Sequence, residues 1–303
     1  MSNTYHIHPT AVVEDGATVH PDAVVGPFCF VSRHARIGAG TKLVAHVSVL
    51  GRTTLGEHNT IWPQATLGAE PQDLKFHGEA VTLAIGHHNE IRENVTIHPG
   101  TGNGGGSTIV GSGNLIMVGS HIGHDCIVGN HVILANQVQL AGHVVIEDHA
   151  NIAGIVGVHH YCTIGQYSYV GGMTRVVKDV TPFMLYEGDP ARERGVNAIG
   201  LQRHRIDPVS ITRLKDAFKR LFRADRKAAK VNGNGKPTGV INLADGLTSL
   251  EKDYGDDAYI SILATFLRNR SIGTSGRYRE TLREDDRRRN VSSLLKKTVA
   301  VDA

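Results

Sequence analysis

A histidine and an aspartate stand side by side at His124 and Asp125, in a stretch whose other positions are mostly apolar or small. A histidine can take a proton from a hydroxyl or an amine near neutral pH. A carboxylate beside it can hold the imidazole in one tautomer and stabilise the imidazolium that forms. The pair therefore predicts general-base catalysis, provided that the fold brings an acceptor substrate to it.

A period of six residues indicates the fold that must position this pair. Apolar residues recur at every sixth position over residues 7–67 and again over residues 110–176, and small residues such as Ala11 and Ala23 follow four positions later. Neither an α-helix nor a single strand has this period, whereas a hexapeptide repeat does. We therefore predict an all-β, left-handed parallel β-helix over residues 1–190, with about 18 residues and three short strands in each coil.

This repeat predicts which side chains are neighbours. Residues one coil apart lie above one another at about 4.8 Å. His124 then lies beneath Gly142, which lies beneath His160, and Asp125 lies beneath His143. A glycine at this place lets its backbone N–H approach a developing oxyanion. The predicted catalytic residues are His124 as general base, Asp125 as its partner, Gly142 as backbone donor, and His143.

Two other interpretations of these histidines stay open. Hexapeptide repeats carry surface histidines that have no chemical role, and His20 and His58 are examples of such positions in this chain. Histidines on neighbouring coils can also bind zinc, as in β-helix enzymes that hydrate carbon dioxide, with His98, His124 and His143 as ligands. A zinc site would leave a loop and a basic C-terminal region without a role, so we expect no metal and no other cofactor.

Two segments interrupt the period of six. Residues 68–84 contain the sequence EPQDLKF and are typical of a loop, and a second interruption contains the glycines of residues 102–106. A phosphate-binding loop would continue with Gly-Lys-Ser/Thr into a helix, and neither follows here. We therefore predict that the second segment is a flexible excursion.

The pattern becomes helical after Pro190. Apolar residues recur at steps of three and four from Ile211 onward and predict an amphipathic helix, for which Ser210 is the expected cap. Further apolar groups extend to residues 294–295, residues 232–237 are typical of a linker, and residues 287–289 form an arginine-rich tail. The second predicted domain is thus helical and spans residues 191–303.

Charge also divides the chain. From Arg203 onward there are 22 Lys and Arg against 13 Asp and Glu, whereas the preceding residues have 10 against 16. A segment with an excess of nine positive charges predicts an acidic protein partner that is steered to it electrostatically. We do not expect nucleic acid to be the natural partner.

The remaining composition indicates a cytoplasmic protein. No apolar run is long enough to span a bilayer, and the N-terminal residues are unlike a secretory signal, so we expect no stable membrane insertion. Cys29, Cys126 and Cys162 all occupy the small position of the repeat. They are predicted to be packing residues and not a disulfide, because the nearest two in one column are two coils apart.

Several stretches outside the bare repeat resemble the acyl-(acyl-carrier-protein)–UDP-N-acetylglucosamine O-acyltransferases of lipid A synthesis. Hexads alone are shared by many acyltransferases, but these motifs in one order are specific. The resemblance is close over residues 5–203 and looser in the helical tail. The motifs are residues 71–76 (PQDLKF), 104–106 (GGG), 120–126 (SHIGHDC), 135–136 (AN), 140–143 (LAGH), 158–162 (VHHYC), 195–197 (GVN) and 200–203 (GLQR).

The resemblance implies a homotrimer of parallel β-helices with active sites between subunits. Such an enzyme transfers a 3-hydroxyacyl chain from acyl carrier protein to the 3-hydroxyl of UDP-N-acetylglucosamine, the first step of lipid A biosynthesis. The basic helical domain would dock the acidic carrier protein. His124 and Asp125 match the family's general base and its partner, and Gly142 matches the backbone donor to the thioester oxyanion.

The resemblance also implies substrate-binding residues and three departures from the family pattern. Gly172 matches the end of the acyl groove and implies that a long chain is accepted, unless Met173 protrudes into it. The usual residues at the positions of His160, Ile199 and His204 are a glutamine, an acidic residue and a basic residue. The implied substrate-binding residues are Asp73, Lys75, His121, His159, His160, Asn197 and Arg203.

Three alternative functions remain. A related N-acyltransferase acts later in the same pathway but carries a domain before its β-helix, and here the hexads begin at Ile7. Some relatives acylate a 3-amino sugar, but the intact pair of His124 and Asp125 favours O-acylation, because an alcohol needs a base more than an amine does. A non-catalytic scaffold is disfavoured by the cluster of polar residues at the predicted site.

Overall fold

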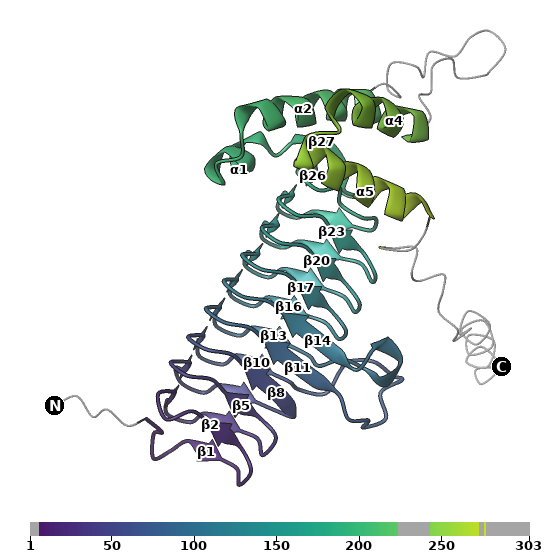
Figure 1. The fold of residues 1–303 in the computed structure, drawn as a ribbon. Helices are drawn as coiled ribbons and strands as arrows, with labels where there is room; N and C mark the ends of the chain where they lie inside the picture. The colour runs from purple at the N-terminus through teal and green to yellow at the C-terminus, as the bar shows by residue number, and fades with distance from the viewer. Residues whose placement is uncertain (1–5, 224–242, 273–275, 277–303) are drawn as a thin grey trace, which may run out of the picture.

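The computed structural model describes residues 6–223, 243–272 and 276 (Figure 1). Within them the chain winds into a left-handed β-helix with three parallel sheets of nine, eight and ten strands, and helices cover one end. The predicted fold class is therefore confirmed. The predicted linker at residues 232–237, the arginine-rich tail and the apolar pair at residues 294–295 lie outside the described residues.

Each coil contributes one strand to each sheet, and most strands have only two residues. The first sheet contains β1 (Val12–Val13), β4 (Phe30–Val31), β7 (Ser48–Val49), β10 (Thr66–Leu67), β13 (Thr96–Ile97), β16 (His121–Ile122), β19 (Gln139–Leu140), β22 (Gly157–Val158) and β25 (Arg175–Val176). The second sheet contains β2 (Thr18–Val19), β5 (Arg36–Ile37), β8 (Arg52–Leu55), β11 (Thr82–Ile85), β14 (Ser107–Val110), β17 (Ile127–Val128), β20 (Val145–Ile146) and β23 (Thr163–Ile164). The third sheet contains β3 (Val24–Val25), β6 (Lys42–Leu43), β9 (Thr60–Ile61), β12 (Glu90–Ile91), β15 (Leu115–Ile116), β18 (Ile133–Leu134), β21 (Asn151–Ile152), β24 (Tyr169–Val170), β26 (Met184–Glu187) and the antiparallel β27 (Arg192–Val196).

The apolar residue of each hexad fills the interior of the coil. Ile61, Ile122 and Leu140, one from each of three such hexads, are fully buried. Burial of these aliphatic side chains in stacked layers supplies the main stabilisation of a fold that has few aromatic residues. The first coil is the exception, because only one side of it is covered: Ile7 is 45% exposed, and Val13 and Val19 are partly buried. All three cysteines are buried and free, as their place in the repeat predicts.

The corners of the coils accommodate six of the 18 histidines of the chain. The residue at the tip of many corners has a positive φ, and histidine, asparagine and aspartate accept this backbone conformation more readily than most residues do. Asp125 belongs to this set, but His124 does not. The histidines in the set are His46, His58, His88, His131, His143 and His149.

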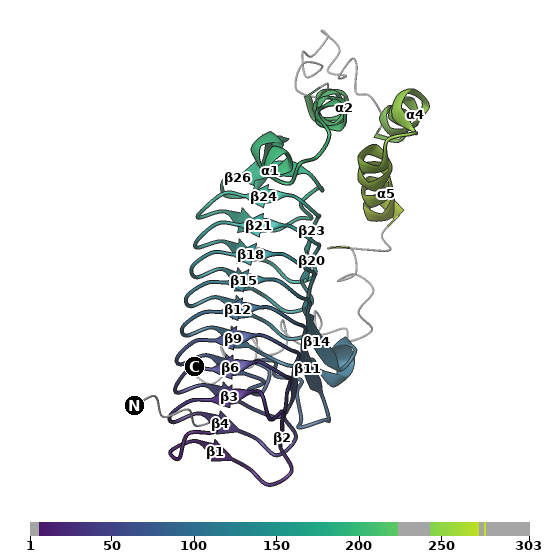
Figure 2. The ribbon, with the colours of Figure 1, turned by 60° about the vertical axis from the view of Figure 1, so that its left-hand side comes forward.

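The two interruptions lengthen single coils without breaking the register. Thr66 of β10 pairs with Thr96 of β13, and Thr96 pairs with His121 of β16, so the extra residues leave the β-helix as loops between the first and second sheets. The second loop contains a short 3-10 helix, η1 (Gly102–Gly104). Figure 2 shows this segment projecting from the side of the β-helix near β11 and β14.

The C-terminal helices lie at one end of the β-helix (Figures 1 and 2). They are α1 (Ala198–Arg203), α2 (Pro208–Phe218), a π-helical turn (Lys219–Arg223), α4 (Leu243–Tyr254) and α5 (Ala258–Ile272). The helices contribute buried side chains to the hydrophobic core, among them Leu214 of α2, Leu250 of α4 and Leu263 of α5. No helix in the described part of the chain is long and apolar enough to cross a membrane.

The predicted cap of α2 is wrong. Asp207 caps this helix by accepting a hydrogen bond from the Val209 N–H, and Pro208 is its first residue. Ser210 lies inside the first turn, and its hydroxyl donates to Asp257 at 2.8 Å. The helix begins earlier than the apolar pattern indicated, because proline is favoured at the first helical position and carries no hydrophobic signal of its own there.

Candidate active site

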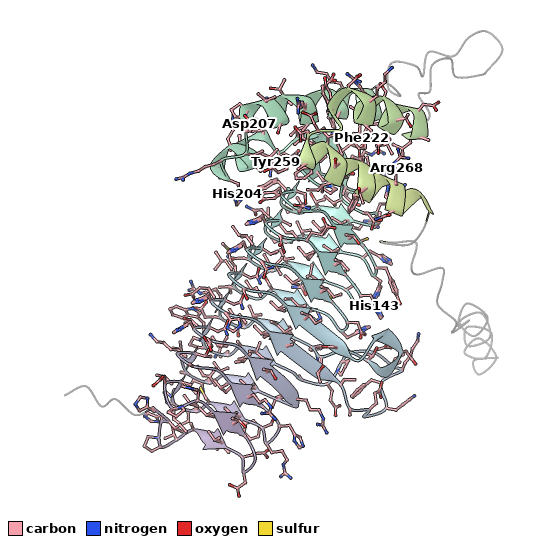
Figure 3. The ribbon with its side chains drawn as sticks, in the orientation of Figure 1. His143, His204, Asp207, Phe222, Tyr259 and Arg268 are labelled. Atoms are coloured by element: carbon pink, nitrogen blue, oxygen red, sulfur yellow. The ribbon has the colours of Figure 1, made fainter. Side chains whose placement is uncertain are left out.

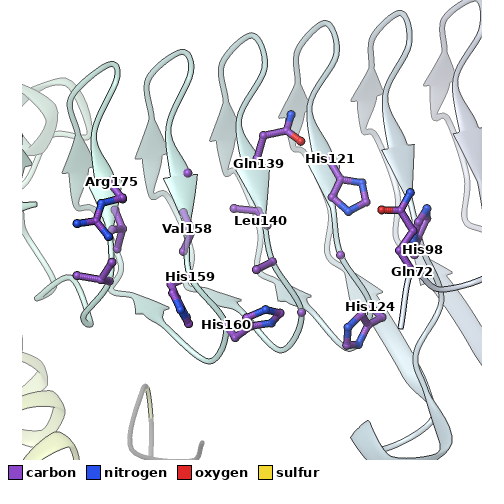
Figure 4. A pocket seen from close by; sticks show the side chains of 16 residues that line it. Gln72, His98, His121, His124, Gln139, Leu140, Val158, His159, His160 and Arg175 are labelled. Atoms are coloured by element: carbon purple, nitrogen blue, oxygen red, sulfur yellow. The ribbon is translucent and has the colours of Figure 1, made fainter. Parts of the chain in front are cut away.

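A cavity of about 430 Å³ runs along the first sheet and the corners that follow its strands (Figure 4). His121 lies on β16, and Leu140 lies on β19. Gln72, from the first loop, closes one end, and Arg175 of β25 lies at the other. The polar side chains along the cavity are Gln72, His98, His121, His124, Gln139, His159, His160 and Arg175.

The predicted pair forms a hydrogen-bonded dyad at this cavity. The Nδ1 atom of His124 lies 2.7 Å from Oδ2 of Asp125, and their side chains are 11% and 1% exposed. An ionised carboxylate only accepts hydrogen bonds, so Nδ1 carries the hydrogen and Nε2 carries the lone pair. A general base needs this arrangement, with the basic nitrogen left for the substrate.

The register places Gly142 directly above the imidazole, as predicted. The His143 N–H donates to the His124 carbonyl at 2.9 Å. A Cβ atom at Gly142 would lie 2.5 Å from Cε1 and Nε2 of His124, so a larger residue cannot occupy this position without moving the ring. Among the described residues no acceptor is seen for the Gly142 N–H. This N–H is therefore available to a substrate oxygen beside the dyad.

His143 contacts the same carboxylate from the next coil. Its Nε2 lies 3.9 Å from Oδ2 of Asp125, and its ring meets that of His124 edge to face at 5.1 Å. His143 also stacks on Tyr161 at 4.3 Å. The side chain is thus held on both sides and turned toward Asp125, and it does not line the cavity itself.

Two further histidines at the cavity are neutral near pH 7. Burial lowers the pKa of His98 to about 4, with smaller contributions from His121 and His124. Burial also lowers the pKa of His121, and its Nδ1 lies 2.8 Å from the Thr96 hydroxyl. Neutral imidazoles can both donate and accept, which suits the recognition of sugar hydroxyls.

Thr101 is a residue that the sequence analysis missed. Its N–H donates to Oδ1 of Asp125 at 2.8 Å, and its hydroxyl donates to Oδ2 at 2.7 Å. The prediction of a flexible excursion was therefore wrong at this point, because the segment is bonded to the dyad. Gly104 of the same segment also packs against the dyad, because a Cβ atom there would lie 2.1 Å from the carboxyl group of Asp125.

The structure brings only some of the implied substrate-binding residues to the cavity. His121, His159 and His160 line it. Asp73 and Lys75 lie in the same loop as Gln72, and the Lys75 N–H donates to Asp73 at 3.1 Å, but their side chains are not part of the lining.

The residues implied for the nucleotide and the acyl end lie elsewhere in the single chain. Asn197 caps α1 and donates to the Tyr167 carbonyl, and Arg203 is exposed at the end of the same helix. Gly172 and Met173 lie at the corner between the third and first sheets. Met173 is 77% exposed, and a Cβ at Gly172 would meet only ordinary contacts.

The site also has three groups that could surround a cation. One atom each from His124, Asp125 and His143 lie within 4.8 Å of one another. His98, which the alternative zinc set combined with His124 and His143, is not part of this group in the described residues. Oδ2 of Asp125 is already engaged by His124 and by Thr101, and this donor set suits proton transfer better than metal binding.

Comparisons with known proteins agree with the resemblance. A family model described as UDP N-acetylglucosamine O-acyltransferase, domain 2, matches residues 179–275, and a bacterial transferase hexapeptide model matches residues 107–142. The acyl-(acyl-carrier-protein)–UDP-N-acetylglucosamine O-acyltransferase of Anaeromyxobacter sp. (strain K) is 43% identical over 267 residues, which are 88% of this chain and 98% of that protein. The protein of the same name from Anaeromyxobacter sp. (strain Fw109-5) is 42% identical over 68% of this chain and 74% of its own.

Solved structures of UDP-N-acetylglucosamine O-acyltransferases are also similar to this chain. The UDP-N-acetylglucosamine O-acyltransferase of Moraxella catarrhalis has a TM-score of 0.79 and 38% identity, covering 88% of this chain and 97% of its own. LpxA from Acinetobacter baumannii has a TM-score of 0.78 and 36% identity, covering 86% of this chain and 95% of its own. The similarity covers the β-helix and the C-terminal helices, and the protein belongs to the family of acyl-(acyl-carrier-protein)–UDP-N-acetylglucosamine O-acyltransferases.

Proposed function

We propose that the protein transfers a 3-hydroxyacyl chain from acyl carrier protein to the 3-hydroxyl of UDP-N-acetylglucosamine in the cytoplasm, as the first step of lipid A biosynthesis. The observation that carries the proposal is the buried dyad of His124 and Asp125 at the cavity, in a chain of this family. An alcohol is a poor nucleophile near neutral pH, and the dyad supplies the base that it requires.

The reaction follows from the geometry of the dyad. The sugar hydroxyl gives its proton to Nε2 of His124 while its oxygen attacks the thioester carbonyl. Asp125 stabilises the imidazolium through Nδ1 at 2.7 Å, and the Gly142 N–H faces the oxyanion of the tetrahedral intermediate. The intermediate then expels the carrier thiolate, which takes the proton from His124. The products are the ester and the free thiol, and the base is regenerated.

The acceptor is tested by supplying each candidate sugar separately. His160, in place of the usual glutamine, lines the cavity in the coil above Gly142 and alters the pocket for the 3-position. This observation favours a second candidate, N-acylation of a UDP-3-amino sugar. Enzyme and 3-hydroxyacyl carrier protein are incubated with UDP-N-acetylglucosamine or with the 3-amino sugar, and the products are identified by mass. Product from the amino sugar alone would overturn O-acylation.

We infer that the active form is a homotrimer with sites shared between subunits. His204, next to Arg203, packs on His149 and Tyr167 at the corner between the second and third sheets, whereas His143 lies at the corner between the first and second (Figure 3). A nucleotide bound by Arg203 of one chain could therefore meet the dyad of another. Coexpressed His124→Ala and Arg203→Ala chains should regain activity that neither has alone.

The carrier protein is proposed to dock on the C-terminal helices. Arg213, Arg220 and Arg268 form ion pairs with carboxylates within these helices, so they are less available to a partner. Lys215 and Lys219 of the same region are exposed. Initial rates at low carrier concentration should fall as salt rises, because salt screens electrostatic steering. A rate that stays flat from low to high salt would contradict docking at this surface.

Gly172 and Met173 are proposed to set the acyl-chain length. Gly172 leaves room beside the Gly154 carbonyl, 3.4 Å from the position of a Cβ, so a long 3-hydroxyacyl chain should pass. Competition between long and short 3-hydroxyacyl donors measures this. A clear preference for the short donor would contradict the proposal that Gly172 admits a long chain, and would indicate that Met173 blocks the acyl groove.

A further inference from the structure

The carboxylate of Asp125 is surrounded by donors from two separate parts of the chain. Its side chain is 1% exposed. His124 contacts Oδ2 from the neighbouring position in sequence, and Thr101 contacts both carboxylate oxygens from the second loop. The two donors of Thr101 act on one rigid group, because its N–H reaches Oδ1 and its hydroxyl reaches Oδ2. Such a two-point contact fixes the rotation of a carboxylate as well as its position.

The second loop is folded so that it presents Thr101 in this way. The Thr101 carbonyl accepts hydrogen bonds from Gly104 at 3.0 Å and from Gly106 at 2.9 Å, which close the loop into a tight turn. The Gly104 Cα packs so near the carboxyl group of Asp125 that only glycine leaves room for it. The loop therefore fits closely around the Asp125 side chain.

The first loop supports the second one through Glu79. This carboxylate accepts from the Gly102 N–H at 2.8 Å and from the His77 N–H at 2.8 Å. These backbone hydrogen bonds lower the pKa of Glu79, that of His77 most, so it stays ionised in the neutral range. The loop that contributes Gln72 to the cavity is thereby connected to the loop that holds Asp125.

We propose that Thr101 is a positioning residue for acyl transfer, which fixes Asp125 so that Nε2 of His124 points into the cavity. The inference rests on the proposed role of His124 as the base. Thr101 touches no reacting atom and acts through Asp125. A catalytic imidazole must be held within about 10–20° of its productive orientation, and a carboxylate that could rotate would not hold it so.

The test compares Thr101→Val with a matched control. Valine keeps the backbone N–H and the branched shape but removes the hydroxyl that contacts Oδ2. We expect kcat to fall roughly tenfold while KM for UDP-N-acetylglucosamine stays within about twofold, since misplacement of a reacting group mainly affects the chemical step. Thr101→Ser should restore kcat. The control is Thr108→Val, because Thr108 is fully buried and its hydroxyl has no hydrogen-bond partner among the described residues.

A double-mutant cycle separates positioning from a general loss of packing. If Thr101 acts through Asp125, then Thr101→Val should change kcat less than about twofold in an Asp125→Asn background, because residues in one network are not additive. An equal tenfold loss in both backgrounds, or no loss with Asp125 present, would overturn the inference. If the valine variant does not fold, Thr101→Ala, which adds no new atoms, takes its place in the same cycle.

The outcome also distinguishes this inference from the proposed function. His124→Ala is measured in the same assay. If that variant remains active, the assignment of the base fails and the role of Thr101 fails with it. If His124→Ala is inactive while Thr101→Val matches the parent protein, only the positioning role is overturned.

Discussion

Two pairs of histidines occupy neighbouring coils of the same β-helix, with similar distances between their rings but different orientations. At the corner between the second and third sheets, the rings of His131 and His149 lie 5.0 Å apart and are tilted by 10°, and His149 stacks in turn on Tyr167. At the corner between the first and second sheets, His124 and His143 lie 5.1 Å apart, but their planes meet at 87°. His131 and His149 are 18 residues apart and occupy equivalent positions of the repeat, whereas His124 and His143 are 19 residues apart and occupy different corner positions.

A pKa lowered by burial is not specific to the histidines at the cavity. Burial lowers the pKa of His149 in the stack, just as it lowers the pKa of His121 at the cavity. His124 itself differs from the stacked histidines in its backbone conformation and in its partner. His131 and His149 have positive φ and point along the stack, whereas His124 precedes the positive-φ residue Asp125 and bonds to it. A neutral buried histidine is therefore no sign of catalysis in this fold, and what sets His124 apart is its hydrogen bond to a fixed carboxylate.

The largest expected effect on activity distinguishes His124 from the stacked histidine His131. His124→Ala should lower the rate of acyl transfer by roughly 100- to 10,000-fold, because a general base contributes that much. His131→Asn should keep activity within about twofold, since asparagine accepts the left-handed backbone of His131. Ester formation with a saturating donor is the measurement. Activity of His124→Ala within threefold of the parent would remove the base assignment.

A smaller but still large effect is expected when the imidazole of His124 is turned without being removed. Gly142→Ala places a Cβ 2.5 Å from the His124 ring, so the ring must leave its orientation toward the cavity, and kcat should fall roughly hundredfold. Gly195→Ala, whose Cβ would meet nothing within 4 Å, is the control for folding. Equal kcat values for the two variants would mean that orientation of the ring does not matter.

The next effect concerns the partner of the base. Asp125→Asn keeps a side chain that suits the positive φ but removes the charge that stabilises the imidazolium. We expect kcat to fall by roughly ten- to hundredfold, less than for His124→Ala, because an amide oxygen can still accept from Nδ1. Single-turnover rates of the two variants give the comparison. A loss greater than that of His124→Ala would show that the aspartate has a second role.

The smallest expected effect is on stability and depends on pH. His98 has a pKa of about 4 in the folded protein, against an ordinary value of 6.5, because it is buried. Between these values the unfolded chain binds more protons, so stability is complete above pH 6.5 and is lost as the pH falls toward 4. The His98 contribution to the loss between pH 7 and pH 5 should be roughly 1–2 kcal/mol.

Urea denaturation at pH 7 and pH 5 measures this contribution. His98→Gln should lose less stability than the parent over that range, because glutamine has no proton to gain. His20→Gln is the control, since the His20 side chain is 47% exposed. Identical losses for the parent and His98→Gln would contradict the burial argument.

The sequence by itself determined the features that repeat. A period of six converts a separation in sequence into a separation in space, so the stacking of Gly142 on His124 and the burial of Cys126 followed from counting residues. The identity of the dyad also followed, because the two residues are adjacent and lie at a corner. Local spacing was sufficient wherever the geometry of one coil is the geometry of the next.

Only the tertiary structure decided what the interruptions and the helices do. The contact of Thr101 with Asp125 could not be counted, because a loop that leaves the coil has no fixed rise or rotation to bring it back. Ser210 was expected to cap α2 and instead donates to Asp257, which is distant in sequence. The side chain of His124 is fixed in a related way: the repeat places the residue, whereas its partner Asp125 is held by Thr101 of a non-repeating loop.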